Sequence, residues 1–191
     1  MNTEITIALL LGIGLSASSG FRVFIPLLVA SVASYFDVLH LGQGFDWLGS
    51  VPSMIVFGVA AVVEVIAYYI PVVDNFLDTI ATPLAIGAGA LLTTAVLPID
   101  ENLSRWAMGI IIGGGSAASI QTGTSLLRLF STKATLTTAN PIVSTTENVS
   151  ATTSSILALF FPVLIGIIFL IIIGYVLFRM AKWRQSKNSS S

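Results

Sequence analysis

The chain has 191 residues, of which 55% are hydrophobic and 9% are charged, and its mean hydropathy is +0.96. Soluble domains carry about 25% charged residues, so this composition cannot build a water-facing surface. The formal net charge of −1 gives no electrostatic footprint for nucleic acid. The lack of cysteine excludes disulfides and zinc–thiolate sites. The composition therefore excludes a soluble or nucleic-acid-binding protein and indicates the lipid bilayer as the chain's main partner.

Five apolar segments are long enough for transmembrane helices, which need about 20 residues in a range of about 17 to 25. In chain order they cover residues 5–35, 51–70, 76–97, 103–130 and 155–178. The first segment lacks the basic start of a cleaved signal peptide, so we expect it to stay in the mature protein. The sequence predicts an all-α, polytopic integral membrane helix bundle with about five transmembrane helices.

Basic residues near the segment ends predict the orientation. Half of the eight lysines and arginines directly follow the last apolar segment, at Arg179, Lys182, Arg184 and Lys187. By the positive-inside rule we expect a cytoplasmic C-terminus in a multi-pass protein of the cell membrane. Residues 1–191 then form a single transmembrane domain, with one half at 5–97, a second at 103–178 and a basic tail at 179–191.

Two connections between the apolar segments differ from ordinary loops. Residues 131–155 are dominated by serine and threonine, which leaves two interpretations open. They form either a solvated loop or a strap packed into the protein at membrane depth, where irregular backbone is tolerated only if buried or facing a wet cavity. Residues 36–50 combine Phe45 and Trp47 with two aspartates, a composition typical of an interfacial stretch with an aromatic anchor.

Two motifs recur in the same order in both halves. Residues 16–24 (SASSGFRVF) align without gaps with residues 122–130 (TGTSLLRLF). An acidic residue followed by asparagine, with threonine four residues later, occurs at Asp74-Asn75 and again at Glu147-Asn148. Transporters built from repeats place their substrate site at the repeat interface near the bilayer midplane, where helices are broken. The pattern predicts two unequal internal repeats with broken helices, and we also expect a break at Gly113-Gly114-Gly115.

Polar side chains at membrane depth are the candidate site, because a charge there costs about 2.5 to 3.5 kcal/mol unless it is paired or hydrated. Arg22 follows the hydroxyls of Ser18 and Ser19 by one helical turn. The candidate residues of a substrate or ion pathway are Ser18, Ser19, Arg22, Glu64, Asp74, Asn75, Asp78, Gln121, Arg128, Glu147 and Asn148.

Two interpretations of Arg22 and Arg128 stay open. In the first, both form structural ion pairs with acidic residues of the bundle. In the second, both flank a polar pathway and hold an anion, while a carboxylate such as Glu64 takes up and releases a proton. Burial favours the neutral acid and a nearby arginine favours the ionised form, so sequence does not decide between them.

Motifs for catalysis are scarce. His40 is the single histidine, which excludes a multi-histidine metal site, and the chain contains no phosphate-binding loop. The polar set also lacks a recognisable pair of nucleophile and base. We therefore expect no enzymatic activity, no cofactor and no metal site.

The first half resembles a known family. Residues 16–28 (SASSGFRVFIPLL), 45–48 (FDWL), Glu64 and 71–79 (PVVDNFLDT) are similar to the signature of a bacterial membrane-protein family catalogued as Domain of Unknown Function 4126. In the second half the similarity rests on Arg128, Asn140-Pro141 and Glu147-Asn148. The chain departs from the family in having Tyr68-Tyr69 where members often carry a charged pair, and Gln121 and Thr124 where some carry basic residues. The resemblance implies a polytopic protein of the bacterial inner membrane and no particular activity.

These patterns lead to one functional hypothesis and one alternative. The hypothesis is a membrane transporter or channel that moves a small solute or ion through a polar centre between two repeats. In its most specific form the transported ion is an anion and its movement is coupled to protons. The alternative is a non-transporting scaffold, assembly or lipid-interacting protein whose buried charges are structural. Homo-oligomerisation is compatible with both.

Overall fold

The computed structural model describes the backbone of residues 3–135 and 140–188. Within these ranges the side chains of residues 71–76, 78, 129–135, 140–141 and 183–188 lie outside the description. The described chain is helical and contains no strand, which confirms the predicted all-α class. Its elements are α1 (Thr3–Ser19), α2 (Phe24–Tyr35), the 3-10 helix η1 (Asp46–Gly49), α3 (Val51–Ala67), α4 (Pro71–Val96), α5 (Asn102–Met108), the π-helical segment η2 (Gly109–Gly114), α6 (Gly115–Thr135), α7 (Asn140–Phe160) and α8 (Pro162–Asn188).

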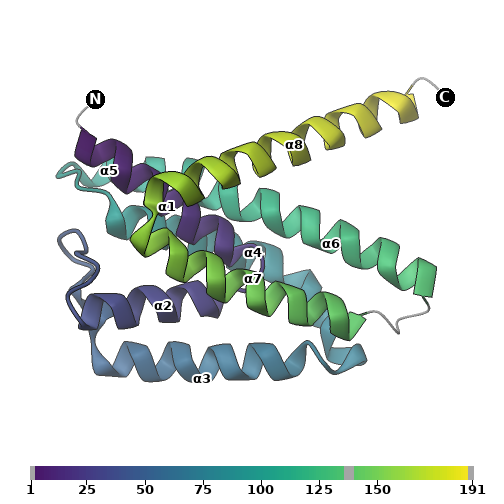
Figure 1. Ribbon diagram of the computed structural model, residues 1–191, viewed down its shortest axis with the longest axis horizontal. Coiled ribbons are helices and arrows are strands. Elements are labelled where there is room, and N and C mark those ends of the chain that lie inside the picture. Colours follow the sequence, from purple (N-terminus) through teal and green to yellow (C-terminus); the bar gives the residue numbers. More distant parts are fainter. Residues whose placement is uncertain (1–2, 136–139, 189–191) are drawn as a thin grey trace.

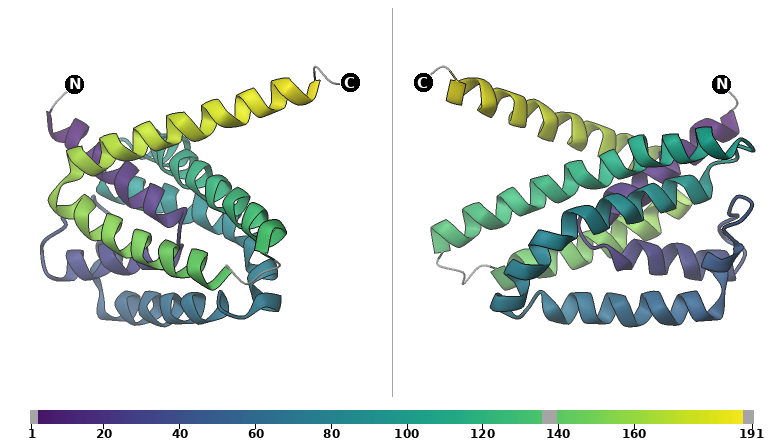
Figure 2. Two further views of the ribbon diagram at one scale, coloured as in Figure 1. Left: turned by 45° about the vertical axis from the view of Figure 1, so that its right-hand side comes forward. Right: turned by 180° about the vertical axis from the view of Figure 1, so that it is seen from behind.

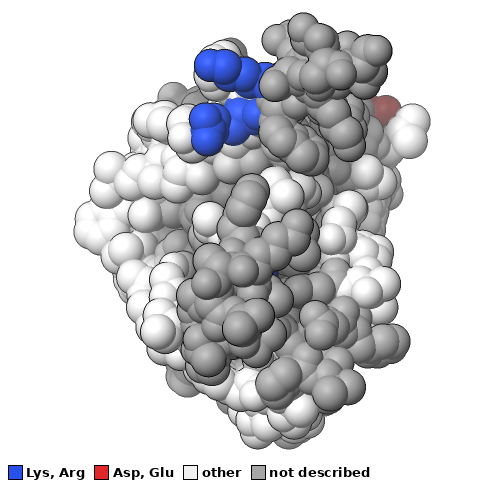
Figure 3. Space-filling model, turned by 90° about the vertical axis from the view of Figure 1, so that its right-hand side faces the viewer, with Lys and Arg blue, Asp and Glu red and all other residues white. Residues whose placement is uncertain are grey.

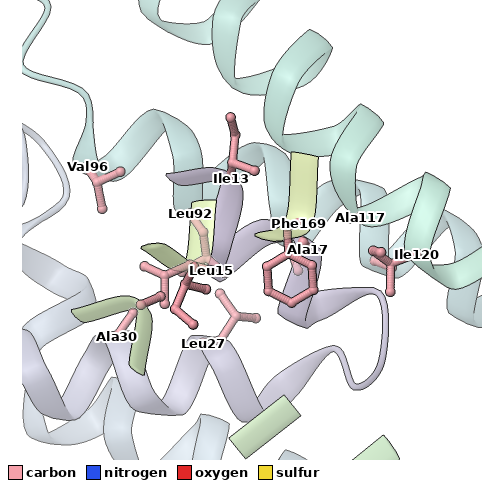
Figure 4. Close-up of a cluster of buried hydrophobic side chains, with 14 of the residues drawn as sticks. Ile13, Leu15, Ala17, Leu27, Ala30, Leu92, Val96, Ala117, Ile120 and Phe169 are labelled. Carbon is pink, nitrogen blue, oxygen red and sulfur yellow. The ribbon is translucent and has the colours of Figure 1, made fainter. Parts of the chain in front are cut away.

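Helix α1 lies at the centre of the bundle. It packs against α2, α4, α6, α7 and α8, and every residue of its second half, from Gly12 to Ser19, is buried. Leu15 is fully buried and lies among Leu27 of α2 and Leu92 of α4, in the main cluster of apolar side chains (Figure 4). A helix with apolar or small residues on all sides can be enclosed in this way. Helices α2, α4, α6, α7 and α8 therefore surround α1.

The first predicted transmembrane segment is two helices rather than one. The chain turns back after Ser19, and α2 runs beside α1 in the opposite direction (Figure 1). Helix α2 has 12 residues, about 18 Å at 1.5 Å per residue, which is shorter than a hydrocarbon core of about 30 Å. The single helix predicted over residues 5–35 is therefore wrong, and Arg22 lies in the turn of a helical hairpin.

The predicted break at Gly113-Gly114-Gly115 is a π-helical segment instead. Helices α5 and α6 continue into one another through η2 without a loop. Gly113 and Gly114 serve close packing against α4, where a Cβ on Gly89 would lie 2.6 Å from the carbonyl oxygen of Gly113. A wider helical turn combined with small residues allows the two backbones to approach this closely.

Residues 140–155 form helix and are packed into the bundle. Ala151 and Ser155 of α7 are fully buried, so the solvated-loop interpretation is wrong for this part, while residues 136–139 lie outside the description. Helix α7 ends at Phe160 and Pro162 starts α8, since a proline disfavours helical backbone at the residue before it. The fifth predicted segment, residues 155–178, is therefore divided between two helices.

Two described helices contain windows long and apolar enough to cross a membrane, Thr79–Val96 in α4 and Pro162–Lys182 in α8. Only 17% of the α8 window is buried, and α8 extends away from the bundle at its C-terminal end (Figure 2). At that end, basic side chains gather along one edge of a face that is otherwise nearly uncharged in its described part (Figure 3). Arg179 and Lys182 are both exposed there.

Candidate functional site

Arg22 is the largest fully buried side chain of the described bundle and has three sets of partners. Its Nε donates to Oδ1 of Asn148 at 2.5 Å, and its Nη2 donates to the carbonyl oxygen of Ser144 at 3.3 Å. Its Nη1 lies 3.3 Å from Oε2 of Glu147, within ion-pair distance but without hydrogen-bond geometry to any described residue. The guanidinium in the α1–α2 turn is thus held by successive turns of α7.

Arg128 approaches the same carboxylate from α6. Its Nε donates to Oε1 of Glu147 at 3.1 Å, and its Nη2 contacts Oε2, the oxygen that Arg22 also faces. This fork of two parallel contacts is the strong form of an arginine–carboxylate pair. The side chains of Arg128 and Glu147 are only 7% and 6% exposed. The two arginines of the aligned motifs therefore converge on one buried carboxylate.

Tyr68 supplies an aromatic face to both guanidinium groups. The Cζ atoms of Arg22 and Arg128 lie 3.7 and 4.3 Å from the centroid of its ring. A cation within about 6 Å of a ring face is attracted by the ring quadrupole, more strongly where water is excluded. Tyr68 ends α3 and is buried, so α3 joins the contact between the α1–α2 turn, α6 and α7. We call Arg22, Arg128, Glu147, Asn148 and Tyr68 the arginine centre.

Glu64 lies beside this centre and has a different set of partners. Its Oε1 accepts the backbone N–H of Val23 at 2.8 Å, and its Oε2 accepts that of Phe24 at 3.0 Å. These are N–H groups at the start of α2, where the helix has no side-chain cap of its own and its dipole favours a negative charge. Glu64 thus caps α2 from α3 and fixes the backbone that carries Arg22.

The predicted hydroxyls bond to other groups than Arg22. Ser18 donates to the carbonyl oxygen of Gly14 and pairs with Ser154 at 2.7 Å, and Ser19 donates to the carbonyl oxygen of Leu15 at 3.3 Å. Both serines are fully buried, so their hydrogen bonds satisfy polar groups inside the packed helices. The one-turn spacing brings the carbonyl oxygen of Ser18 to the backbone N–H of Arg22 at 3.3 Å, but neither hydroxyl is a partner of the guanidinium.

In the second half, Gln121 is buried, and its Nε2 donates to Oγ of Ser125 on its own helix at 3.5 Å. The hydroxyl of Thr124 lies 3.0 Å from the carbonyl oxygen of Gln121 on its own helix and 3.5 Å from that of Gly20 in the α1–α2 turn. The remaining predicted residues, Asp74, Asn75 and Asp78, belong to the first turns of α4, and their side chains lie outside the description.

Two partners in the centre were missed in the candidate set. Tyr68 stands out in the sequence only as a departure from the family pattern, and an aromatic residue at the end of an apolar helix gives no sign of its partners. Ser144 contributes its backbone carbonyl, which no side-chain pattern can reveal. Among the described residues, no three acidic or histidine side chains come together as metal ligands.

The arrangement binds a carboxylate between two guanidinium groups in a site without bulk water. Both arginines face Oε2 of Glu147, so this oxygen occupies the position that an oxygen of a free anion would occupy if the Glu147 side chain moved away. Paired charges of this kind interact strongly because little water screens them.

The comparisons with known proteins give one match. A family model described as "Domain of unknown function (DUF4126)" matches residues 9–182, which includes the whole arginine centre. No curated protein and no solved structure matches the chain.

Proposed function

The chain belongs to the DUF4126 family, and we propose that it is a multi-pass membrane protein that moves a small anion through the arginine centre. One observation carries the proposal: the guanidinium groups of Arg22 and Arg128, from the two aligned motifs, both face Oε2 of Glu147 inside the bundle. In this proposal the carboxylate of Glu147 is a tethered substitute for the transported anion, and the structure is the occluded state.

The mechanism follows from exchange at this position. When the Glu147 side chain moves away, a free anion takes the place between the two guanidinium groups, and its departure restores the ion pair. Arg22 retains its anchors to Asn148 and to the carbonyl oxygen of Ser144 during the exchange, so the site stays formed. A site organised in advance avoids the free-energy cost of ordering arginine side chains at each cycle.

The length and apolar character of two helices support the membrane part of this proposal. The two windows in α4 and α8 are long and apolar enough to span the bilayer, and basic residues follow the α8 window. We place the C-terminus of α8 in the cytoplasm by the positive-inside rule. The short α1–α2 hairpin, with Arg22 in its turn, then enters the protein without crossing the bilayer as one helix.

The test is anion flux in proteoliposomes, measured with chloride, nitrate and phosphate against gluconate at equal ionic strength. We expect Arg22→Ala and Arg128→Ala to lower flux about tenfold or more, the factor that corresponds to about 1.4 kcal/mol of lost interaction. Arg179→Ala makes the same chemical change at an exposed position and is the matched control. Flux that persists unchanged in both centre variants would refute the proposal. An imposed pH gradient in the same assay tests proton coupling.

The second candidate function is a non-transporting scaffold, and the burial of the paired charges in the arginine centre favours it. Every member of the ion-pair set is nearly fully buried, as expected for charges that only hold α6, α7 and the α1–α2 turn together. Glu147→Gln separates the two functions, because it keeps the shape of the side chain and removes its charge. If the centre is an anion site, small anions raise the thermal stability of this variant saturably, whereas a purely structural centre shows no preference among anions.

A further inference from the structure

A third buried arginine, Arg105, lies outside the arginine centre, in the wall of an open cavity. The cavity has a volume of about 910 Å³ and lies between the connection 36–50 and the start of α5. Its walls include Arg105, Phe45, Trp47, Trp106 and Leu91. These residues come from the α2–α3 connection, α4 and α5, at the end of the bundle where α1 begins (Figure 1).

Arg105 is buried but has no acidic partner among the described residues. It is 6% exposed, and both of its hydrogen bonds start at Nη2: one to the carbonyl oxygen of Gln43 at 3.0 Å and one to Oδ1 of Asn102 at 3.1 Å. Its Nε is buried and has no hydrogen-bond partner in the described structure. A buried cation with neutral acceptors only is costly unless a further group neutralises it. Arg105 therefore leaves a positive charge uncompensated in the cavity wall.

The surroundings of Arg105 fix the position of its guanidinium group. Its Cζ lies 5.2 Å from the ring centroid of Phe45, which itself packs against Trp106 at 6.0 Å between centroids. The backbone N–H of Gly42 donates to the carbonyl oxygen of Ala95 at 2.7 Å and ties the connection to the end of α4. The cation is thus held in place before any ligand arrives, which lowers the cost of binding.

We propose that this cavity binds a phosphate group, with Arg105 as the cation that recognises it. Arginine pairs with phosphate oxygens in a planar, charge-assisted geometry. The half-exposed indoles of Trp47 and Trp106 and the apolar side chain of Leu91 offer a surface for an attached hydrocarbon portion. Tryptophan is enriched at membrane–water interfaces, and basic pockets between transmembrane helices bind lipid head groups. Asp100 is on the exposed rim, where water screens its charge.

The source of the phosphate is either a phospholipid head group or inorganic phosphate, and fluorescence titrations distinguish them. The full chain, purified in a phosphate-free detergent and carrying Trp183→Phe, reports through Trp47 and Trp106 alone, since the chain has three tryptophans. It is titrated separately with dioctanoyl phosphatidylglycerol, inorganic phosphate and dioctanoylglycerol, which has the same acyl chains without phosphate. A saturable response to the phospholipid alone indicates a lipid site, and an equal response to inorganic phosphate indicates a site for the free ion.

Two variants test the role of Arg105 independently. Arg105→Gln is expected to weaken binding about 10- to 100-fold, as for the loss of a charged hydrogen bond. Gly42→Ala keeps the charge but moves it, because a Cβ at this position would lie 2.7 Å from Nη1 of Arg105, so it carries the test if Arg105→Gln does not fold. Arg179→Ala is the control and should bind as the parent does. The proposal is overturned if dioctanoylglycerol matches the phosphate ligands, or if the folded variant at 105 or 42 binds as tightly as the parent.

Discussion

Arg22 and Arg105 are both arginines with less than a tenth of their surface exposed, yet their surroundings differ in kind. Arg22 has a carboxylate, an amide and a carbonyl as partners, contributed by a helix more than a hundred residues later in the chain. Arg105 has only neutral acceptors, from its own helix and a nearby connection, and lines an open cavity. Burial alone therefore does not tell an enclosed ion pair from a cation that lines an open cavity.

The difference lies in what each arginine holds together. The arginine centre joins the α1–α2 turn to α3, α6 and α7 through contacts over long sequence separations. The open cavity around Arg105 is lined by the connection 36–50, the C-terminal part of α4 and the start of α5. Removing Arg22 must therefore disturb the packing of the bundle, whereas removing Arg105 changes mainly the cavity. Arginine-to-alanine substitutions at both positions measure this contrast.

The largest effect is expected for Arg22→Ala. The substitution removes two buried hydrogen bonds from a charged donor, to Asn148 and to the carbonyl oxygen of Ser144, and the ion pair to Glu147, which keeps Arg128 as its partner. Hydrogen bonds of charged groups contribute about 1.5 to 3 kcal/mol each, which gives about 3 to 6 kcal/mol for the two. We expect a loss of unfolding free energy of this size, measured by denaturant or thermal unfolding in detergent. Arg22→Lys keeps the charge but loses the separate Nε and Nη2 donors to Asn148 and Ser144, so its stability should be intermediate. A stability close to that of Arg179→Ala would show that the centre does not hold the bundle together.

An intermediate effect is expected for Glu64→Gln. The substitution keeps one carbonyl oxygen as an acceptor but removes the charge that binds the N–H groups of Val23 and Phe24. Hydrogen bonds to charged groups contribute about 1.5 to 3 kcal/mol, so the loss should fall in or below this range. Hydrogen exchange at the start of α2 checks the cause, because these two amides should exchange faster while those of α8 stay unchanged. Unchanged exchange at Val23 and Phe24 would contradict the capping role.

The sequence predicted the chemistry of the centre better than its architecture. Charges are so rare in this chain that those inside the apolar segments stand out, and Arg22, Arg128, Glu147 and Asn148 do lie together in the structure. Their alignment between the halves is a local pattern that can be read without structure. The family resemblance stated from the same motifs is confirmed by the family match over residues 9–182.

The turn at residues 20–23 could not be predicted from local sequence. No proline interrupts this stretch, and its apolar character continues on both sides. The turn is stabilised by Glu64, forty residues away, and by the close packing of Gly20, where a Cβ would lie 2.6 Å from the carbonyl oxygen of Ala117. Both are tertiary contacts. A hydropathy window therefore merges α1 and α2 into one span.

Arg105 was missed for a different reason, since the information was present. Once the four basic residues of the tail and the two arginines of the centre are set aside, Arg105 and Lys133 are the remaining basic residues of the chain. Arg105 follows a short polar connection, where a charged residue normally faces water, so its place in the sequence does not predict its burial. The structure buries it because Phe45 and the backbone of the connection 36–50 fold over it.

The smallest loss of stability is expected for Arg105→Ala. A small loss is the result that distinguishes Arg105 from Arg22. The substitution removes two hydrogen bonds to acceptors on Gln43 and Asn102, both exposed residues whose oxygens can bind water instead. Hydrogen bonds of charged groups contribute about 1.5 to 3 kcal/mol each, but both acceptors can rehydrate and the substitution also removes a buried charge without an ion-pair partner, so the net loss should fall below this range. The measurement is the same unfolding experiment, with Arg22→Ala and Arg179→Ala as upper and lower references. A loss as large as that of Arg22→Ala would mean that Arg105 supports the fold as the centre does, and the contrast between an enclosed ion pair and an open ligand site would then fail.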